Sequence, residues 1–214
     1  MMEPDALPDQ GTASVGTRLM FEPDAPLHES EHFFDFPFPS DLRLDASGFR
    51  DLRGYPNPYA VPLMNNMLSI ADQHRGWLMQ PVVWFRFDGP MGTRSGVDQA
   101  VVIIDLAEGT ILPAIYAVLE PDPYVPEGVV AVSPRPGIIL RPDAAHAVLL
   151  LEECGDENGV RLDTPERLER LLGGDDETDG LASLYEPLRA AMGLLEIDAV
   201  DVAAATVFTT GDPV

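Results

Sequence analysis

One short stretch of the chain decides its fold class: Val82-Val83-Trp84-Phe85-Arg86-Phe87. In an extended backbone successive side chains point to opposite faces, so Val83, Phe85 and Phe87 would share one face. Branched and aromatic residues of this kind are enriched in strands. The stretch therefore predicts a β-strand with one buried face.

Similar apolar stretches recur along the chain, separated by turns rich in Asp, Gly and Pro, which is typical of an all-β domain. Further strands are predicted at 100–106, 111–119, 129–132, 146–152 and 206–210. The pair Asn158-Gly159 favours a hairpin turn, and we expect 160–163 to be its return strand. The fold class expected is mainly β, an antiparallel β-sandwich.

Helices are predicted in two regions. Leu63, Met67 and Ile70 lie near helical spacing within 61–74, and Gly76 follows as a natural stop. The second region is an insertion into the β pattern at about 164–196. It begins with Thr164 as N-cap and Pro165 in the first turn, and Gly173-Gly174 ends its first helix. Each of its two helices has an apolar face: Leu168, Leu171 and Leu172 in the first, and Leu181, Leu184, Tyr185, Leu188 and Met192 in the second.

The domain organisation expected is an extended acidic lead-in over 1–32, followed by one sandwich domain over 33–214 that contains the helical insertion. Within 33–42, aromatic residues alternate with Pro and Asp, a pattern that helices do not tolerate. We expect this segment to be extended and laid on the core.

Charge and composition exclude several classes of protein. The chain of 214 residues has 13 Lys+Arg against 36 Asp+Glu, a net charge of −23, which opposes sequence-independent binding of nucleic acids. All 13 basic residues are Arg, so Schiff-base chemistry has no lysine. Cys154 is the only cysteine and has no disulfide partner within the chain. No apolar run approaches the length of a membrane span.

Four short motifs resemble the bacterial Ig-like domains of the S-layer type. They are Phe85-Arg86-Phe87-Asp88-Gly89-Pro90-Met91, the stretch from Leu140-Arg141-Pro142 to Val148, the turn Asp156-Glu157-Asn158-Gly159, and the closing Val207-Phe208-Thr209-Thr210. His146 stands where that family usually has Tyr. The upstream 36–42 and 55–58 are similar to the N-terminal module of secreted bacterial lipases, but no G-x-S-x-G motif occurs.

This resemblance implies a non-catalytic, extracellular or cell-surface Ig-like module for adhesion, spacing or substrate presentation. Its partner is then a surface glycan, a lipid-like substrate or a C-terminal catalytic domain. One alternative is the accessory domain of a secreted lipase or esterase whose catalytic part lies beyond residue 214. Another is a calcium-stabilised binding domain. The chain starts without the pattern of a signal peptide, so we expect any export signal to have been removed.

Two stretches have metal-ligand spacing. His28-Glu29-Ser30-Glu31-His32 is a literal H-E-x-x-H, in which His28 and His32 would hold zinc if the motif lay in a stable helix. Nearby prolines leave room for barely one turn, so an exposed polar segment is expected there. The second stretch is close to an EF-hand loop, with Asp175, Glu177, Asp179 and Glu186 as candidate calcium ligands. No cofactor is expected apart from this calcium.

The remaining candidates are aromatic residues and a thiol. Trp77, Trp84, Tyr116 and Tyr124 either line a ligand groove or belong to the core, and burial in the core is the commoner role of such residues. Cys154 is expected to be an incidental thiol because acidic neighbours oppose thiolate formation.

Overall fold

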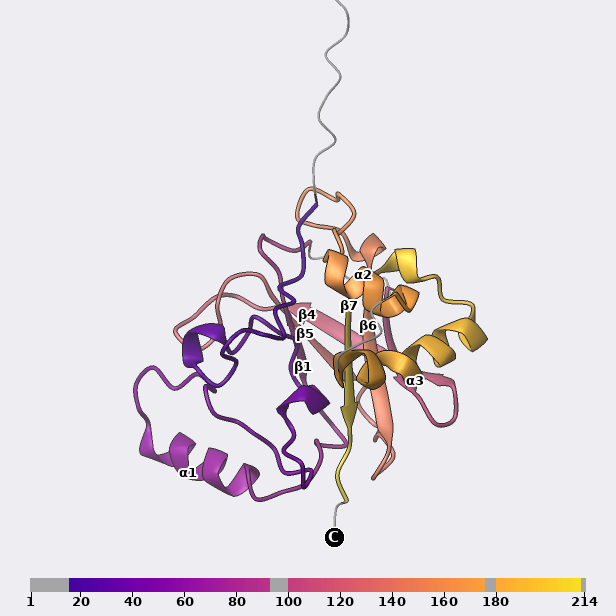
Figure 1. The fold of residues 1–214 in the computed structure, drawn as a ribbon. Coiled ribbons are helices and arrows are strands. Elements are labelled where there is room, and N and C mark those ends of the chain that lie inside the picture. The colour runs from indigo at the N-terminus through magenta and orange to yellow at the C-terminus, as the bar shows by residue number, and fades with distance from the viewer. Residues whose placement is uncertain (1–15, 93–99, 176–179, 213–214) are drawn as a thin grey trace, which may run out of the picture.

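The computed structural model describes residues 16–92, 100–175 and 180–212. Two antiparallel sheets dominate the fold, one with the strand order β1-β5-β4 and the other with the order β3-β2-β6-β7 (Figure 1). The strands are β1 (Val83–Arg86), β2 (Val101–Asp105), β3 (Thr110–Leu112), β4 (Ala114–Val118), β5 (Val129–Pro134), β6 (Ala145–Leu151) and β7 (Val202–Thr209). Buried residues of both sheets belong to one hydrophobic core. The mainly β prediction is confirmed, and the two sheets are compatible with a β-sandwich.

Strand β1 has the alternation that its sequence predicts. Val83 and Phe85 are fully buried and Phe87 is nearly so, whereas Trp84 and Arg86 on the other face are half-buried. Strand β1 pairs with β5, with Phe85 opposite Val130. The buried face therefore contributes to the core between the sheets, and the opposite face is left to hold other segments of the chain.

The single strand predicted over 111–119 is wrong, because the chain changes sheets at Pro113. Residues before it form β3, which pairs with β2, and residues after it form β4, which pairs with β5. Proline has no N–H for a ladder hydrogen bond and restricts its own backbone. Pro113 therefore ends one ladder and allows the next strand to begin in the other sheet.

The return strand predicted at 160–163 is also wrong, although the turn before it forms. Gly159 N–H donates to the Asp156 carbonyl at 3.0 Å, and Gly159 has a φ of 76°. A 3-10 turn, Glu152–Cys154, ends β6 before this turn. Asp163 N–H instead donates to the Thr17 carbonyl at 2.9 Å. The Asp163 N–H, which a return strand would use within the hairpin, is thus bonded to the N-terminal segment.

The described residues also form three α-helices: α1 (Pro62–Ala71), α2 (Glu166–Gly173) and α3 (Gly180–Leu195). The helices predicted within 61–74 and 164–196 are confirmed. Helix α2 begins one residue later than predicted, with Pro165 as N-cap, and ends at Gly174 in the left-handed conformation. Helix α3 packs on β7, where the Tyr185 hydroxyl donates to the Ala205 carbonyl at 3.0 Å. Helices α2 and α3 lie on one side of the molecule and α1 lies apart from them (Figure 1).

Residues 16–42 pack against the sheets without forming a strand of their own. Leu19 and Phe21 are buried in the core, and Leu19 makes an isolated bridge to Phe87. Phe33, Phe34 and Phe36 are buried as well. The segment 33–42 is therefore laid on the core, as its pattern predicts.

Hydrogen bonds to β7 hold this segment in place. The Asp41 carboxylate accepts from Thr209 twice, from its backbone N–H at 2.8 Å and from its hydroxyl at 2.6 Å. The Thr206 hydroxyl, which is buried, donates to the Pro39 carbonyl at 2.7 Å. Burial raises the pKa of Asp41, although the hydrogen bonds from Thr209 oppose this shift. The acceptor atoms of Asp41 therefore stabilise the fold, whereas its buried negative charge does not.

This asymmetry predicts different effects for two substitutions. Asp41→Ala removes both acceptor oxygens and leaves the Thr209 donors unpaired, so we expect a loss of about 1–3 kcal/mol in the free energy of unfolding. Asp41→Asn keeps an acceptor and removes the buried charge, so its effect should be much smaller. Urea denaturation measures both variants, with the exposed Glu120→Ala as control. Equal losses for Asp41→Ala and Asp41→Asn would contradict this account.

Candidate functional site

An apolar pocket of about 260 Å³ lies between β1 and the segments that precede it in the chain. Its lining residues are Phe38, Pro39, Arg50, Leu52, Tyr55, Ala71, Trp77, Leu78, Gln80, Pro81, Val82 and Trp84. Most of these side chains are apolar, and Arg50 is the one charged residue among those described here. A concave apolar lining with a few polar groups is the usual character of a small-molecule site.

Four aromatic rings form the walls of this pocket. Phe38 stacks on Trp84 with ring centroids 5.4 Å apart, and meets Trp77 edge to face at 5.0 Å. Tyr55 also contacts Trp84, at 5.9 Å. Of the aromatic residues that the sequence singles out, Trp77 and Trp84 line the pocket, whereas Tyr124 pairs with Tyr59 elsewhere. Trp77 is only 4% exposed, so it belongs to the core and to the pocket wall at once.

Backbone hydrogen bonds position these rings. Phe38 and Trp84 exchange two of them, at 3.1 and 2.6 Å, which attaches the N-terminal segment to β1. Trp77 N–H donates to the Thr209 carbonyl at 2.7 Å at the end of β7. The approach at this point is close: a side chain on Gly76, which has a φ of 57°, would lie 2.6 Å from the backbone nitrogen of Gly211. The pocket walls are therefore fixed by the sheets.

Helix α1 borders the pocket through Ala71 and also presents an unpartnered apolar surface. Leu68 and Ala71 pack against the core, but the predicted stripe of Leu63, Met67 and Ile70 faces outward, with 67%, 62% and 58% of each residue exposed. The helix has no charged side chain. Leu78 and Val82, which line the pocket, are exposed as well. Apolar surface thus extends from the pocket onto its rim.

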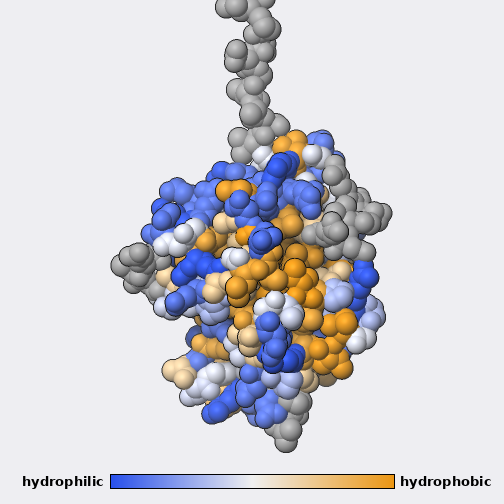
Figure 2. Space-filling model, turned by 90° about the vertical axis from the view of Figure 1, so that its right-hand side faces the viewer, coloured by the Kyte–Doolittle hydropathy of each residue, from blue (hydrophilic) through white to orange (hydrophobic). Residues whose placement is uncertain are grey.

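A second apolar area lies on the opposite side of the molecule. Figure 2 shows apolar side chains gathered on the face that forms the right-hand side of Figure 1. Helix α3 lies on this side (Figure 1), and its Leu194 is 80% exposed. None of the described helices has the length and apolar character needed to span a membrane.

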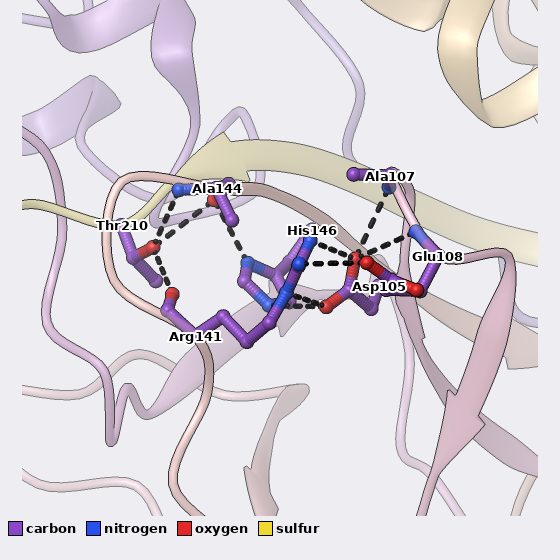
Figure 3. Close-up of polar contacts among 7 residues, drawn as sticks. All are labelled: Asp105, Ala107, Glu108, Arg141, Ala144, His146 and Thr210. Atoms are coloured by element: carbon purple, nitrogen blue, oxygen red, sulfur yellow. Dashed lines mark hydrogen bonds and ion pairs between the residues drawn. The ribbon is translucent and has the colours of Figure 1, made fainter.

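A polar cluster, in which Asp105 and His146 are buried and Arg141 is exposed, connects β2, β6 and the loop before β6 (Figure 3). The Asp105 carboxylate accepts from Arg141 Nε at 2.6 Å and Nη2 at 3.0 Å, and from two backbone N–H groups of the following turn. His146 is fully buried beside it, with Nδ1 2.9 Å from the Ala144 carbonyl and Nε2 3.8 Å from Asp105 Oδ2. None of these residues lines the pocket. The cluster therefore joins the end of β2 to the loop that leads into β6.

Burial has opposite effects on the two titratable groups of this cluster. It lowers the pKa of His146, because the imidazolium is poorly solvated there. Burial alone would raise the pKa of Asp105, but the hydrogen bonds from Arg141 and the following turn hold it below its usual value. His146 is therefore neutral and Asp105 ionised in the folded protein at neutral pH.

The H-E-x-x-H stretch does not lie in an α-helix. Its only helical part is a 3-10 turn, Ser30–His32. His28 is exposed, and His32 Nδ1 lies 2.7 Å from Asp35 Oδ2, a contact that raises the pKa of His32. This segment is thus an exposed turn, and the pairing of His32 with Asp35 gives its imidazole a partner other than a metal.

The candidate calcium ligands are only partly within the described chain. Asp175 is exposed after α2, Glu186 is exposed on α3, and Glu177 and Asp179 lie outside the described residues. Residues 180–186 belong to the helix α3 and not to a loop. Among residues 16–92, 100–175 and 180–212, no group of three or more His, Cys, Asp or Glu side chains is arranged to hold a metal ion. Calcium binding stays a prediction.

Cys154 is buried, and burial followed by the nearby Glu153 raises the pKa of its thiol to about 12. The sequence predicts this inertness from the acidic neighbours, but desolvation contributes more. From the sequence, a ligand groove at Trp77 and Trp84 is the less favoured of two interpretations. Arg50, Leu52 and Tyr55 come from a turn-rich region without periodicity, and only the tertiary fold brings them beside Trp77 and Trp84.

Comparison with known proteins gives no relative. No family model, no curated protein and no solved structure matches this chain. Functional inference therefore depends on the geometry of the chain itself.

The polar cluster predicts a pH dependence of stability. His146 has a lowered pKa in the folded state, so the unfolded chain binds the extra proton as the pH falls through about 6.5. Stability is then lost on acidification. We expect His146→Asn to reduce the loss between pH 7.5 and 5.5 by up to about 1 kcal/mol.

Chemical denaturation across this pH range measures the effect, and His32→Asn is a control of opposite sign. The pKa of His32 is raised, so its contribution is present at low pH and lost as the pH rises. His32→Asn should therefore increase the loss of stability as the pH falls. A His146→Asn profile parallel to that of the unmodified protein would show that His146 is not the group responsible.

Proposed function

We propose that this chain is a non-catalytic binding module that holds a small apolar molecule in the pocket between Phe38, Trp77 and Trp84. One observation carries the proposal: an apolar pocket has walls of contacting aromatic rings that backbone hydrogen bonds fix to β1 and β7. Walls that are already in place lose little conformational entropy when a ligand enters.

The size of the pocket indicates the size of the ligand. At roughly 30 Å³ for each methylene-sized group, a volume of 260 Å³ holds about nine methylene groups, or a larger number of aromatic ring atoms, each of which occupies less volume. Burial of each methylene contributes roughly 0.8 kcal/mol before the cost of association is subtracted. An unbranched chain of this length, or a small aromatic molecule, therefore suits the pocket.

The described reactive groups support a binding role over a catalytic one. The Cys154 thiol is buried and held protonated, and His146 is enclosed between Ala144, Asp105 and the ring of Phe208. Neither residue lines the pocket. A ligand there would meet aromatic faces, aliphatic side chains, Gln80 and Arg50.

The Ig-like identity and the extracellular or cell-surface location are part of the proposal, and the sequence motifs support them. The presence of two antiparallel sheets is compatible with that identity. A second candidate function is the accessory domain of a secreted lipase or esterase. The apolar pocket favours it over adhesion or spacing, because the acyl chain of an ester is a ligand of suitable size and polarity.

Binding is measured with N-phenyl-1-naphthylamine, a neutral fluorescent probe. The chain has two Trp residues, and both line the pocket. Excitation of tryptophan should therefore transfer energy to a bound probe, and the signal should saturate with a dissociation constant on the order of 10 μM.

Ala71→Phe places a large side chain at the pocket wall and should abolish the signal. The matched control is Ala190→Phe on the exposed side of α3, which should leave the signal unchanged. Thermal unfolding checks that both variants fold. A probe that does not bind the unmodified protein, or that binds Ala71→Phe as well, would refute the proposed pocket function.

A further inference from the structure

Arg50 sets this pocket apart from a purely apolar cavity. It is half-buried, and among the described lining residues it alone carries a charge. Its Nε donates to the Gly76 carbonyl, and its guanidinium carbon lies 6.0 Å from the centre of the Trp77 ring. The side chain is therefore held against the aromatic wall and does not extend freely into solvent.

Most of the hydrogen-bonding capacity of Arg50 is unused. A guanidinium has five N–H donors, and within the described residues only its Nε group has an acceptor. No carboxylate of the described chain lies within 4.0 Å of Arg50, whereas most other arginines have such a partner: Arg18, Arg53, Arg86, Arg141, Arg161, Arg167 and Arg170. Among the described residues, Arg43 and Arg189 have no ion pair either, but their terminal amino groups donate to backbone carbonyls, whereas those of Arg50 have no acceptor.

One acidic side chain acts on Arg50 without forming an ion pair with it. Asp72 acts on Arg50 through space, but its carboxylate accepts from Leu52 N–H at 3.1 Å. Burial of the guanidinium among apolar groups lowers the pKa of Arg50, yet arginine stays charged at any physiological pH. A partly desolvated cation beside an apolar pocket is stabilised when an anion pairs with it.

We infer that the ligand is a single-chain carboxylate, with its hydrocarbon chain among Phe38, Trp77 and Trp84 and its carboxylate paired with Arg50. This inference rests on the proposed function of the pocket. The two terminal amino groups of a guanidinium match the two oxygens of a carboxylate in a fork. The pocket volume corresponds to a chain of about eight to ten carbons.

A preference for a carboxylate would have to come from Arg50, because the overall charge of the protein opposes it. A net charge of −23 repels anions in general, and a phosphate head group with up to two charges is repelled more than a carboxylate. A protein of this charge should favour a neutral ligand over an anionic one unless a specific cation reverses the order. Arg50 is the described lining residue able to do so.

The experiment compares decanoate with 1-decanol, which has the same carbon chain and no charge. Both are titrated against the bound fluorescent probe at pH 8, where the carboxylate is ionised. We expect decanoate to bind about 10- to 100-fold more tightly than decanol, the range for hydrogen bonds to charged groups. Arg50→Gln should lower the affinity for decanoate far more than the affinity for decanol, and so remove the preference.

Two further variants separate the effect of charge from effects on folding. Arg50→Lys keeps the charge but lacks the fork, so it should retain only part of the preference for decanoate. Arg170→Gln, on α2 away from the pocket lining, is the matched control and should behave like the unmodified protein. Decanol and the probe report whether the pocket of each variant still binds, and the ratio of the affinities for decanoate and decanol reports the effect of the charge.

The outcomes distinguish this inference from the proposed function. If decanol and the probe bind but decanoate binds no better than decanol, the carboxylate is wrong and the apolar pocket stands. Retention of the preference in Arg50→Gln also refutes the role of Arg50. Tighter binding of decyl phosphate than of decanoate would reassign the head group. If none of these molecules binds, the pocket function itself fails.

Discussion

The hydrogen bonding of strand β7 is the constraint on which the pocket depends. Thr209 binds two segments that are far apart in sequence: its N–H and hydroxyl donate to Asp41, and its carbonyl accepts from Trp77 N–H. One residue at the end of the closing strand thus holds both the N-terminal aromatic segment and the Trp77 wall. Without these bonds, residues 33–81 would have little regular structure to fix their position, because α1 is their only α-helix.

The same constraint explains why an apolar surface remains open. A segment that is fastened at its ends to β1 and β7 does not collapse freely onto its own aromatic rings, so Phe38, Tyr55 and Trp84 contact each other around a space of about 260 Å³. The aromatic rings are rigid, and the backbone at Phe38, Trp77 and Trp84 is held by hydrogen bonds. Arg50 lies at this space with donors to spare, which gives an otherwise apolar site one point of electrostatic selectivity.

The sequence predicts those parts of the fold that depend on local periodicity. The alternation in 82–87 gives β1, and the leucine spacing after Pro165 gives α2, because one buried face has a characteristic period in each case. It does not predict the change of sheet at Pro113 or the loss of the hairpin strand at 160–163, since both depend on which distant segment pairs there. The sequence does not predict that Leu63 and Ile70 are exposed either, because an apolar stripe has the same helical spacing whether it is buried or exposed. Arg50 gives no local signal, because its role comes from a missing partner.

The most direct test of the central claim locates a bound ligand by nuclear Overhauser effects between its methylene protons and the protein. The account predicts effects to the indole rings of Trp77 and Trp84, both of which line the pocket. It also predicts that substitution of Asp41 by Ala, which releases the anchor on β7, weakens these effects. Contacts confined to exposed side chains outside the pocket, such as Leu63 on α1 or Leu194 on α3, would contradict it.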